Sequence, residues 1–193
     1  MSTESTNSKP FKPDKISKGK MASYGAGPFI QTIIWAGYDM LLLYYYEVEL
    51  GLSITLVGLS FVINAIWNMV NDPLVGFLTD KPMRWSKKCG LRMPWIIMSG
   101  VLMIISYYLL YIPPDFGNVK ANPWPLFWYM VIMTCLFDTF FSIFTTHYLG
   151  GFANIFRTKE QRRKGSRAMG LVGPLAGIFI RVVIIANAAY LLS

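Results

Sequence analysis

The sequence predicts an all-α membrane protein with about five membrane-spanning helices. Hydrophobic residues make up 54% of the 193 residues and charged residues only 15%, whereas a soluble domain carries about 25% charged residues. Five stretches are long and apolar enough to cross a bilayer, which takes about 20 residues per helix. The lysines and arginines gather in three short segments outside these stretches.

The predicted elements follow one another with short connections. Residues 1–22 are polar and lack the apolar core of a signal peptide, so we expect a disordered cytoplasmic tail. Residues 23–193 are expected to form a partial transmembrane bundle. Its spans are predicted at about residues 24–46, 53–79, 94–112, 124–149 and 169–192. Helix-stop residues support these bounds, because Lys81-Pro82 follows the second span and Pro113-Pro114 the third.

The positive charges predict the orientation. Sixteen of the 18 lysines and arginines lie in the tail, in residues 81–92 or in residues 157–167. These segments fall on one side of the predicted bundle, and the positive-inside rule assigns that side to the cytoplasm. We therefore expect a multi-pass plasma-membrane protein with a cytoplasmic N-terminus. The clustering also argues against a nucleic-acid partner, although the net charge is +8.

The second span carries one polar face. Ser60, Asn64, Asn68 and Asp72 recur every fourth residue and therefore stack along one side of a helix. Carboxylate and amide oxygens suit a small hard cation such as Na⁺, and a lone carboxylate would suit a proton. We expect Asn64, Asn68 and Asp72 to form a cation site. The alternative is interhelical hydrogen bonding that holds the bundle together.

Charged residues also occur inside other spans. A charge at membrane depth usually faces a partner or a water-filled cavity. The first span places Gln31, Trp35 and Asp39 four residues apart, and the fourth span contains Asp138. The carboxylates of three helices could therefore line one cavity. The alternative is a structural ion pair of Asp39 or Asp138 with Arg181.

Catalytic and structural metal sites are not expected. The chain shows no nucleophile–base pair and no cluster of histidines and cysteines at ligand spacing. We therefore predict that the protein is not an enzyme and has no cofactor other than a coupling ion.

Several motifs resemble the glycoside–pentoside–hexuronide:cation symporters, the melibiose-permease-like branch of the major facilitator superfamily. The run 67–76, WNMVNDPLVG, is similar to the family pattern W-D-x-x-N-D-P-x-x-G. Arg92 and the following Met93-Pro94-Trp95 are similar to the end of the family's basic loop, and residues 76–81 match the superfamily pattern G-x-x-x-D-[RK]. The resemblance covers about residues 24–150. It implies an incomplete N-terminal half of a major-facilitator-type helix bundle.

The resemblance implies secondary active transport, in which a sugar or glycoside crosses the membrane with Na⁺ or H⁺ by alternating access. It assigns the cation to Asp72 and Asn68. The implied substrate residues are Asp138, Thr32 and an arginine of the family's fifth helix, for which the candidates are Arg167 and Arg181. Asp39 and Trp35, from the polar spacing of the first span, are expected as further contacts. Asp80, Lys81, Arg84 and Arg92 are expected to form a cytoplasmic gate.

Two positions depart from the family pattern. Asn68 and Thr32 stand where the family has carboxylates. Because these carboxylates are lost, coupling to H⁺ is an alternative to coupling to Na⁺. A carrier of the same fold for a non-sugar solute such as a lipid is an alternative to a sugar transporter. A further alternative is a fragment that is inactive without a C-terminal half as its partner.

Overall fold

In the computed structural model, five α-helices make up most of the described chain, which comprises residues 17–79, 81, 90 and 92–191. For residues 18, 20–23, 39–40 and 184–191 only the backbone is described. The helices are α1 (Lys18–Tyr44), α2 (Ile54–Thr79), α4 (Met93–Leu110), α5 (Trp124–Ile155) and α6 (Lys159–Leu191), and a short π-helix, η1 (Tyr45–Glu49), continues α1. Within the described residues, α2, α4, α5 and α6 are long and apolar enough to cross a membrane.

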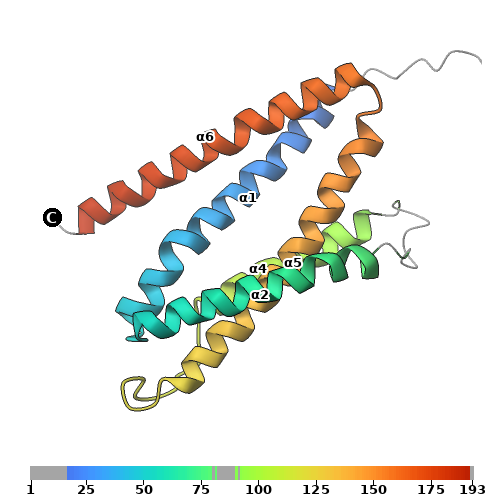
Figure 1. Cartoon of the computed structure of the whole chain (residues 1–193). Helices are drawn as coiled ribbons and strands as arrows, with labels where there is room; N and C mark the ends of the chain where they lie inside the picture. Colours follow the sequence, from blue (N-terminus) through green and yellow to red (C-terminus); the bar gives the residue numbers. More distant parts are fainter. Residues whose placement is uncertain (1–16, 80, 82–89, 91, 192–193) are drawn as a thin grey trace, which may run out of the picture.

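The helices alternate in direction and form two groups that meet at α5 (Figure 1). One group is α1 with α6, and its close contacts pair Pro28 with Gly173 and Thr32 with Gly177. Both pairs are 145 residues apart, so these helices run parallel. The other group packs α2 and α4 against α5. Contacts of Tyr24 with Tyr148 and of Trp35 with Phe141 join α1 to α5 in antiparallel fashion.

The order of the five predicted helices is confirmed, but the helices extend beyond the predicted spans. α1 begins at Lys18, so residues 18–22 are helical although the sequence assigned them to the tail. α5 continues to Ile155, and α6 begins at Lys159, ten residues before the predicted span. The added residues of α6 are mostly Lys, Arg, Glu and Gln, which favour helix but not bilayer. Hydropathy marks the membrane-embedded part of a helix and not its end.

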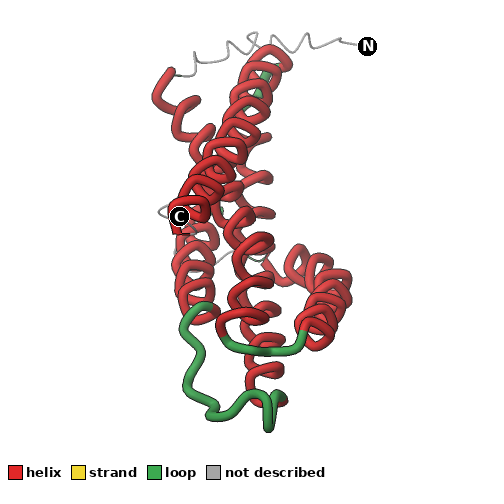
Figure 2. Tube along the Cα trace, turned by 90° about the vertical axis from the view of Figure 1, so that its left-hand side faces the viewer, coloured by secondary structure: helices red, strands yellow, loops and turns green. Residues whose placement is uncertain are grey.

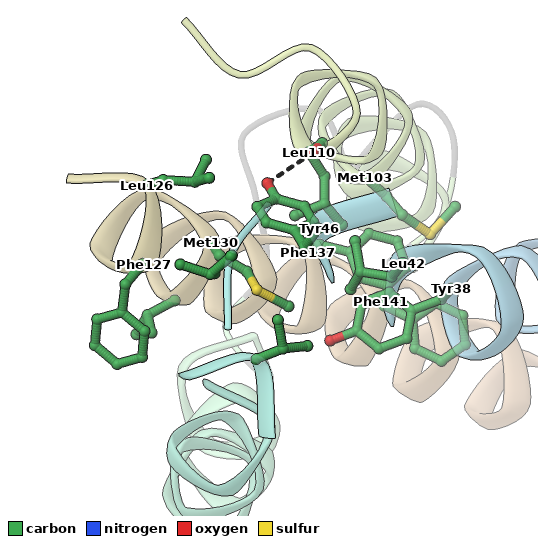
Figure 3. Close-up of a cluster of buried hydrophobic side chains, with 13 residues drawn as sticks. Tyr38, Leu42, Tyr46, Met103, Leu110, Leu126, Phe127, Met130, Phe137 and Phe141 are labelled. Atoms are coloured by element: carbon green, nitrogen blue, oxygen red, sulfur yellow. Dashed lines mark hydrogen bonds between the residues drawn. The ribbon is translucent and has the colours of Figure 1, made fainter. Parts of the chain in front are cut away.

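The hydrophobic core lies where α1, α4 and α5 meet (Figure 3). Tyr46 is fully buried there and donates a hydrogen bond of 2.9 Å to the Leu110 carbonyl. Tyr45 and Tyr129 donate to the carbonyls of Tyr111 and Leu109 at 2.9 and 2.6 Å. The last carbonyls of a helix lack the regular intrahelical donors. The three hydroxyl groups supply donors at and just beyond the end of α4, where the Leu109 carbonyl also accepts from the Ile112 backbone N–H at 3.1 Å.

The connections alternate between the two ends of the bundle. Figure 2 shows the α1–α2 and α4–α5 connections at one end and the α5–α6 connection near the other. At that second end Tyr24 of α1 contacts Phe156, the residue that follows α5, edge-on, and Arg92 lies against Gly150. Among the described basic residues, Lys18 at the start of α1, Lys81 and Arg92 before α4, and Lys159 at the start of α6 therefore lie at one end of the molecule, as the charge distribution predicts. Which side of the membrane this end faces stays a prediction.

Candidate functional site

The polar face of α2 lies against α5. Three contacts join residues 70 positions apart: Ser60 with Met130, Asn68 with Asp138, and Asp72 with Ser142. Asn64 Nδ2 lies 4.0 Å from the Cys135 sulfur, and Trp67 Nε1 donates to Thr139 Oγ1 at 3.0 Å. We call these five contacts the polar ladder. The constant separation along the chain shows that α2 and α5 run parallel, and the contacts show that interhelical hydrogen bonds occupy the predicted cation-binding face.

Asp138 is an enclosed carboxylate of the polar ladder. Its side chain is only 4% exposed, and Oδ1 accepts a hydrogen bond of 3.0 Å from Asn68 Nδ2. The second oxygen, Oδ2, is buried and has no hydrogen-bond partner in the described chain. The buried Asn71 amide lies beside the carboxyl group, but its Nδ2 also lacks a partner among these residues. Oδ2 therefore retains acceptor capacity that a cation or a proton can use.

Asp72 lies one helical turn beyond Asn68 on the same face of α2 and is exposed. Its Oδ1 accepts a hydrogen bond of 2.7 Å from Ser142. Because Asp72 follows Asn68 by four residues, the carboxyl groups of Asp72 and Asp138 are separated along the ladder by a rise of about 6 Å. The structure thus groups Asp138 with the predicted cation residues Asn64, Asn68 and Asp72.

A cavity of about 400 Å³ lies between α1 and α5. Its lining residues are Pro28, Gln31, Thr32 and Trp35 from α1 and Phe141 and Thr145 from α5. The Gln31 amide donates to Thr145 Oγ1 at 3.0 Å, and the rings of Trp35 and Phe141 meet edge-on with centroids 5.3 Å apart. None of the six lining residues is charged, so the cavity offers aromatic surface and neutral hydrogen-bonding groups.

Only some of the predicted substrate residues line the cavity in the structure. Thr32 and Trp35 line the cavity, whereas Asp138 does not. The side chain of Asp39 lies outside the described residues. Arg167 and Arg181 are exposed on α6 and do not line the cavity.

The ion pair considered for Asp138 and Arg181 is not formed. Among the side chains that the structure describes, the ion pair is Glu160 with Lys164, at 2.8 Å. The arginine of α6 therefore does not neutralise Asp138, which instead depends on the amide group of Asn68.

Half of the predicted gate can be located. Lys81 is exposed, and its carbonyl accepts a hydrogen bond of 3.4 Å from Trp95 Nε1. The Arg92 guanidinium lies against Gly150 where any side chain would clash, and its Nε is buried without a partner in the described chain. Asp80 and Arg84 lie outside the described residues, so a gating role stays a prediction.

Sequence reasoning did not assign Gln31, Phe141 or Thr145 to the cavity. Gln31 shares the four-residue spacing of Trp35, so that signal was present. Phe141 is an apolar residue in an apolar span, and nothing in its pattern distinguishes it from a lipid-facing or core residue.

Apolar helices long enough to cross a membrane, with a buried carboxylate and an open, uncharged cavity between them, are typical of multi-pass membrane transporters. Over residues 23–190 the chain matches the family described as MFS/sugar transport protein, and it belongs to that family. This confirms the resemblance to the major-facilitator symporters.

Named relatives include the sodium-dependent lysophosphatidylcholine symporter 1 of Mus musculus, which is 32% identical over 118 residues, or 61% of this chain and 21% of the relative. The human protein of the same name is 35% identical over 101 residues, covering 52% of this chain and 17% of the relative. An uncharacterized symporter of Synechocystis, sll1374, is 24% identical over 179 residues, covering 90% and 32%. The chain thus spans at most about a third of the length of these curated relatives.

Proposed function

We propose that this protein acts in the cation-coupled symport of an amphiphilic solute, such as a lysophospholipid, by alternating access. Asp138, with Asn68 and Asp72, binds the coupling cation. The cavity between α1 and α5 contacts the solute. The observation that carries the proposal is the buried Oδ2 of Asp138, which makes no hydrogen bond among the described residues although the Asn71 amide lies beside the carboxyl group.

The cation part of the proposal is supported by the chemistry of the polar ladder. A buried carboxylate is costly at membrane depth unless it is compensated, and Asn68 supplies a hydrogen bond to only one oxygen. A small hard cation prefers oxygen ligands of this kind. Na⁺ is favoured over H⁺ because the mouse and human relatives are named as sodium-dependent symporters.

The solute part is supported by the cavity. Trp35 and Phe141 present aromatic rings, which attract both apolar chains and quaternary ammonium groups. Thr32 lines the cavity at a position where the sugar symporters resembled here have a carboxylate. The mouse and human relatives are named for lysophosphatidylcholine. These points favour the amphiphile over the sugar that the motifs alone suggested first.

A sugar is the second candidate. The family's description names sugar transport, and Asp138 matches a carboxylate of the symporter family's sugar site. This candidate requires Asp138 to reach the solute, although it does not line the cavity.

The test is an uptake assay with the gene expressed together with any reading frame that continues beyond residue 193. Labelled lysophosphatidylcholine and a labelled glycoside are compared in Na⁺ and in K⁺ buffers of equal ionic strength. We expect Na⁺-dependent uptake of the lysophospholipid and at least a tenfold loss in Asp138→Asn. The matched control is Asp115→Asn, which removes the same charge from an exposed loop carboxylate and should leave uptake unchanged.

The cavity is tested by Trp35→Leu, which should raise the KM for the lysophospholipid. Its control is Trp128→Leu, because Trp128 is 52% exposed on α5 and lies outside the cavity lining. Na⁺-dependent glycoside uptake without lysophospholipid uptake would replace the amphiphile with the sugar. Normal uptake by Asp138→Asn would remove the proposed cation site.

A further inference from the structure

The first turns of α6 carry a concentrated positive charge. Six cations lie between residues 157 and 167: Arg157, Lys159, Arg162, Arg163, Lys164 and Arg167. All six are exposed, and they lie at the basic end of the bundle. The helix continues from this segment into an apolar stretch long enough to cross a membrane. The charges therefore stand next to the point where α6 enters the bilayer.

Three of these six cations contact other groups of the protein. Arg157 Nε donates to the Asn154 carbonyl at 3.3 Å, and Arg162 Nε donates to the Phe156 carbonyl at 2.9 Å. Lys164 pairs with Glu160 at 2.8 Å. The first two contacts hold the turn between α5 and α6, and the third lies along the helix surface.

The other three, Lys159, Arg163 and Arg167, form one row, because they are spaced four residues apart on α6. Eight residues of helix make this row about 12 Å long. None of the three makes a hydrogen bond or an ion pair within 4.0 Å among the residues that the structure describes, and Arg163 also lies within electrostatic reach of Glu160. We call these three residues the basic row.

The opposite face of the same helix is docked onto α5. Gly165 is buried, and a Cβ there would lie 2.9 Å from the rings of both Phe152 and Phe156. Gly165 lies about 200° around the helix from Arg163. The close approach at Gly165 therefore fixes the rotation of α6 and turns the basic row away from the protein.

We propose that the basic row binds anionic phospholipid headgroups in the leaflet at the basic end of the bundle. The charge complementarity is direct, since three exposed cations on a membrane-entering helix match the phosphate and carboxylate groups of such lipids. An acidic protein segment would not need to lie at the height where the helix enters the bilayer. The inference does not depend on the proposed transport function.

The test measures lipid binding to the purified protein in detergent by native mass spectrometry, with phosphatidylserine and phosphatidylcholine as probes. We expect phosphatidylserine to bind about a hundredfold more tightly, and this preference to weaken as salt is raised from 0.05 to 0.5 M. The triple variant K159Q/R163Q/R167Q should lose about fivefold in phosphatidylserine affinity for each residue changed.

The matched control is K9Q/K12Q/K15Q, which removes the same three charges from the N-terminal tail and should change the affinity less than twofold. Equal binding of the two lipids would overturn the proposal, as would an equal loss in the control. Displacement of phosphatidylserine by an equimolar acidic peptide would assign the row to a protein partner instead. If the triple variant does not purify as a monodisperse protein, Arg163→Gln is compared with Arg163→Lys, and equal affinity in this pair would also overturn the proposal.

Discussion

A close contact joins α1 to α5 where the Tyr148 ring lies against Gly27. Tyr24 and Tyr148 stack with centroids 4.9 Å apart, and each hydroxyl group donates to the backbone carbonyl of the other residue. Two reciprocal hydrogen bonds fix the position of the Tyr148 ring. Only a residue without a Cβ fits beneath it.

Gly27→Ala should therefore destabilise the protein, because the added methyl group overlaps the ring of Tyr148. Overpacking of this kind costs about 1–3 kcal/mol, which lowers the midpoint of thermal unfolding in detergent. Gly58→Ala is the control, since no atom outside its own helix backbone lies within 4 Å of a Cβ at that position of α2. Equal midpoints for Gly27→Ala and wild type would contradict this account.

Sequence patterns identified single residues with uneven success. The four-residue spacing correctly placed Asn68 and Asp72 on one face of α2, because that spacing follows from helix geometry alone. It could not identify Asp138 and Ser142 as their partners. Partner identity depends on how two helices are placed against each other, and that information is spread over many apolar contacts.

At the scale of helix pairs, the Asn68–Asp138 hydrogen bond should couple α2 to α5 energetically. A double-mutant cycle of Asn68→Ala and Asp138→Ala is expected to give a coupling of about 1 kcal/mol in the free energy of unfolding. The control cycle pairs Asn68→Ala with Asp115→Ala, whose effects should add. A coupling near zero for the first pair would show that the hydrogen bond does not stabilise the bundle.

The tyrosine hydroxyl groups at the end of α4 give a second prediction at this scale. Tyr46→Phe leaves the buried Leu110 carbonyl without its donor, at a cost of about 1–3 kcal/mol. Tyr44→Phe is the matched control, because Tyr44 is 52% exposed. Chemical unfolding in detergent should separate the two variants, and identical unfolding curves would argue against this role of Tyr46.

The helix ends were the least predictable feature of the elements. A hydropathy pattern ends where the bilayer ends, but α6 continues for ten residues through Lys159 to Ala168. Helix propensity and the Glu160–Lys164 pair sustain these turns in water. Hydropathy and helix propensity have different physical causes, so the end of the apolar pattern does not predict the end of the helix.

For the whole molecule, the placement of the basic segments predicts which end faces the cytoplasm. Single cysteines at Ala121 and Ala153, both exposed and near opposite ends of α5, should label differently with a membrane-impermeant maleimide. In a variant lacking Cys89 and Cys135, we expect the cysteine at 121 to react in intact cells and the one at 153 only after permeabilisation. The reverse pattern would invert the proposed orientation.

The number and order of the helices could be predicted because each apolar stretch must independently satisfy the bilayer. Which helices pair could not. α1 packs on α6 because Gly173 and Gly177 allow Thr32 to approach closely, and glycines of this kind occur in most of the predicted spans. The cavity likewise depends on the placement of α1 relative to α5, which no local pattern contains.

The parallel arrangement of α2 and α5 determines which polar groups would meet if α2 slid along α5. Both helices repeat their polar residues at intervals of about one turn. A translation of α2 by one turn, about 5.4 Å, would place Asn64 opposite Asp138 and Asn68 opposite Ser142, while Asp72 would meet Thr146. Trp67, in contrast, would lose Thr139 and face Ile143. The side chains of Asn64, Asn68 and Asp72 thus match polar positions of α5 in two registers one helical turn apart.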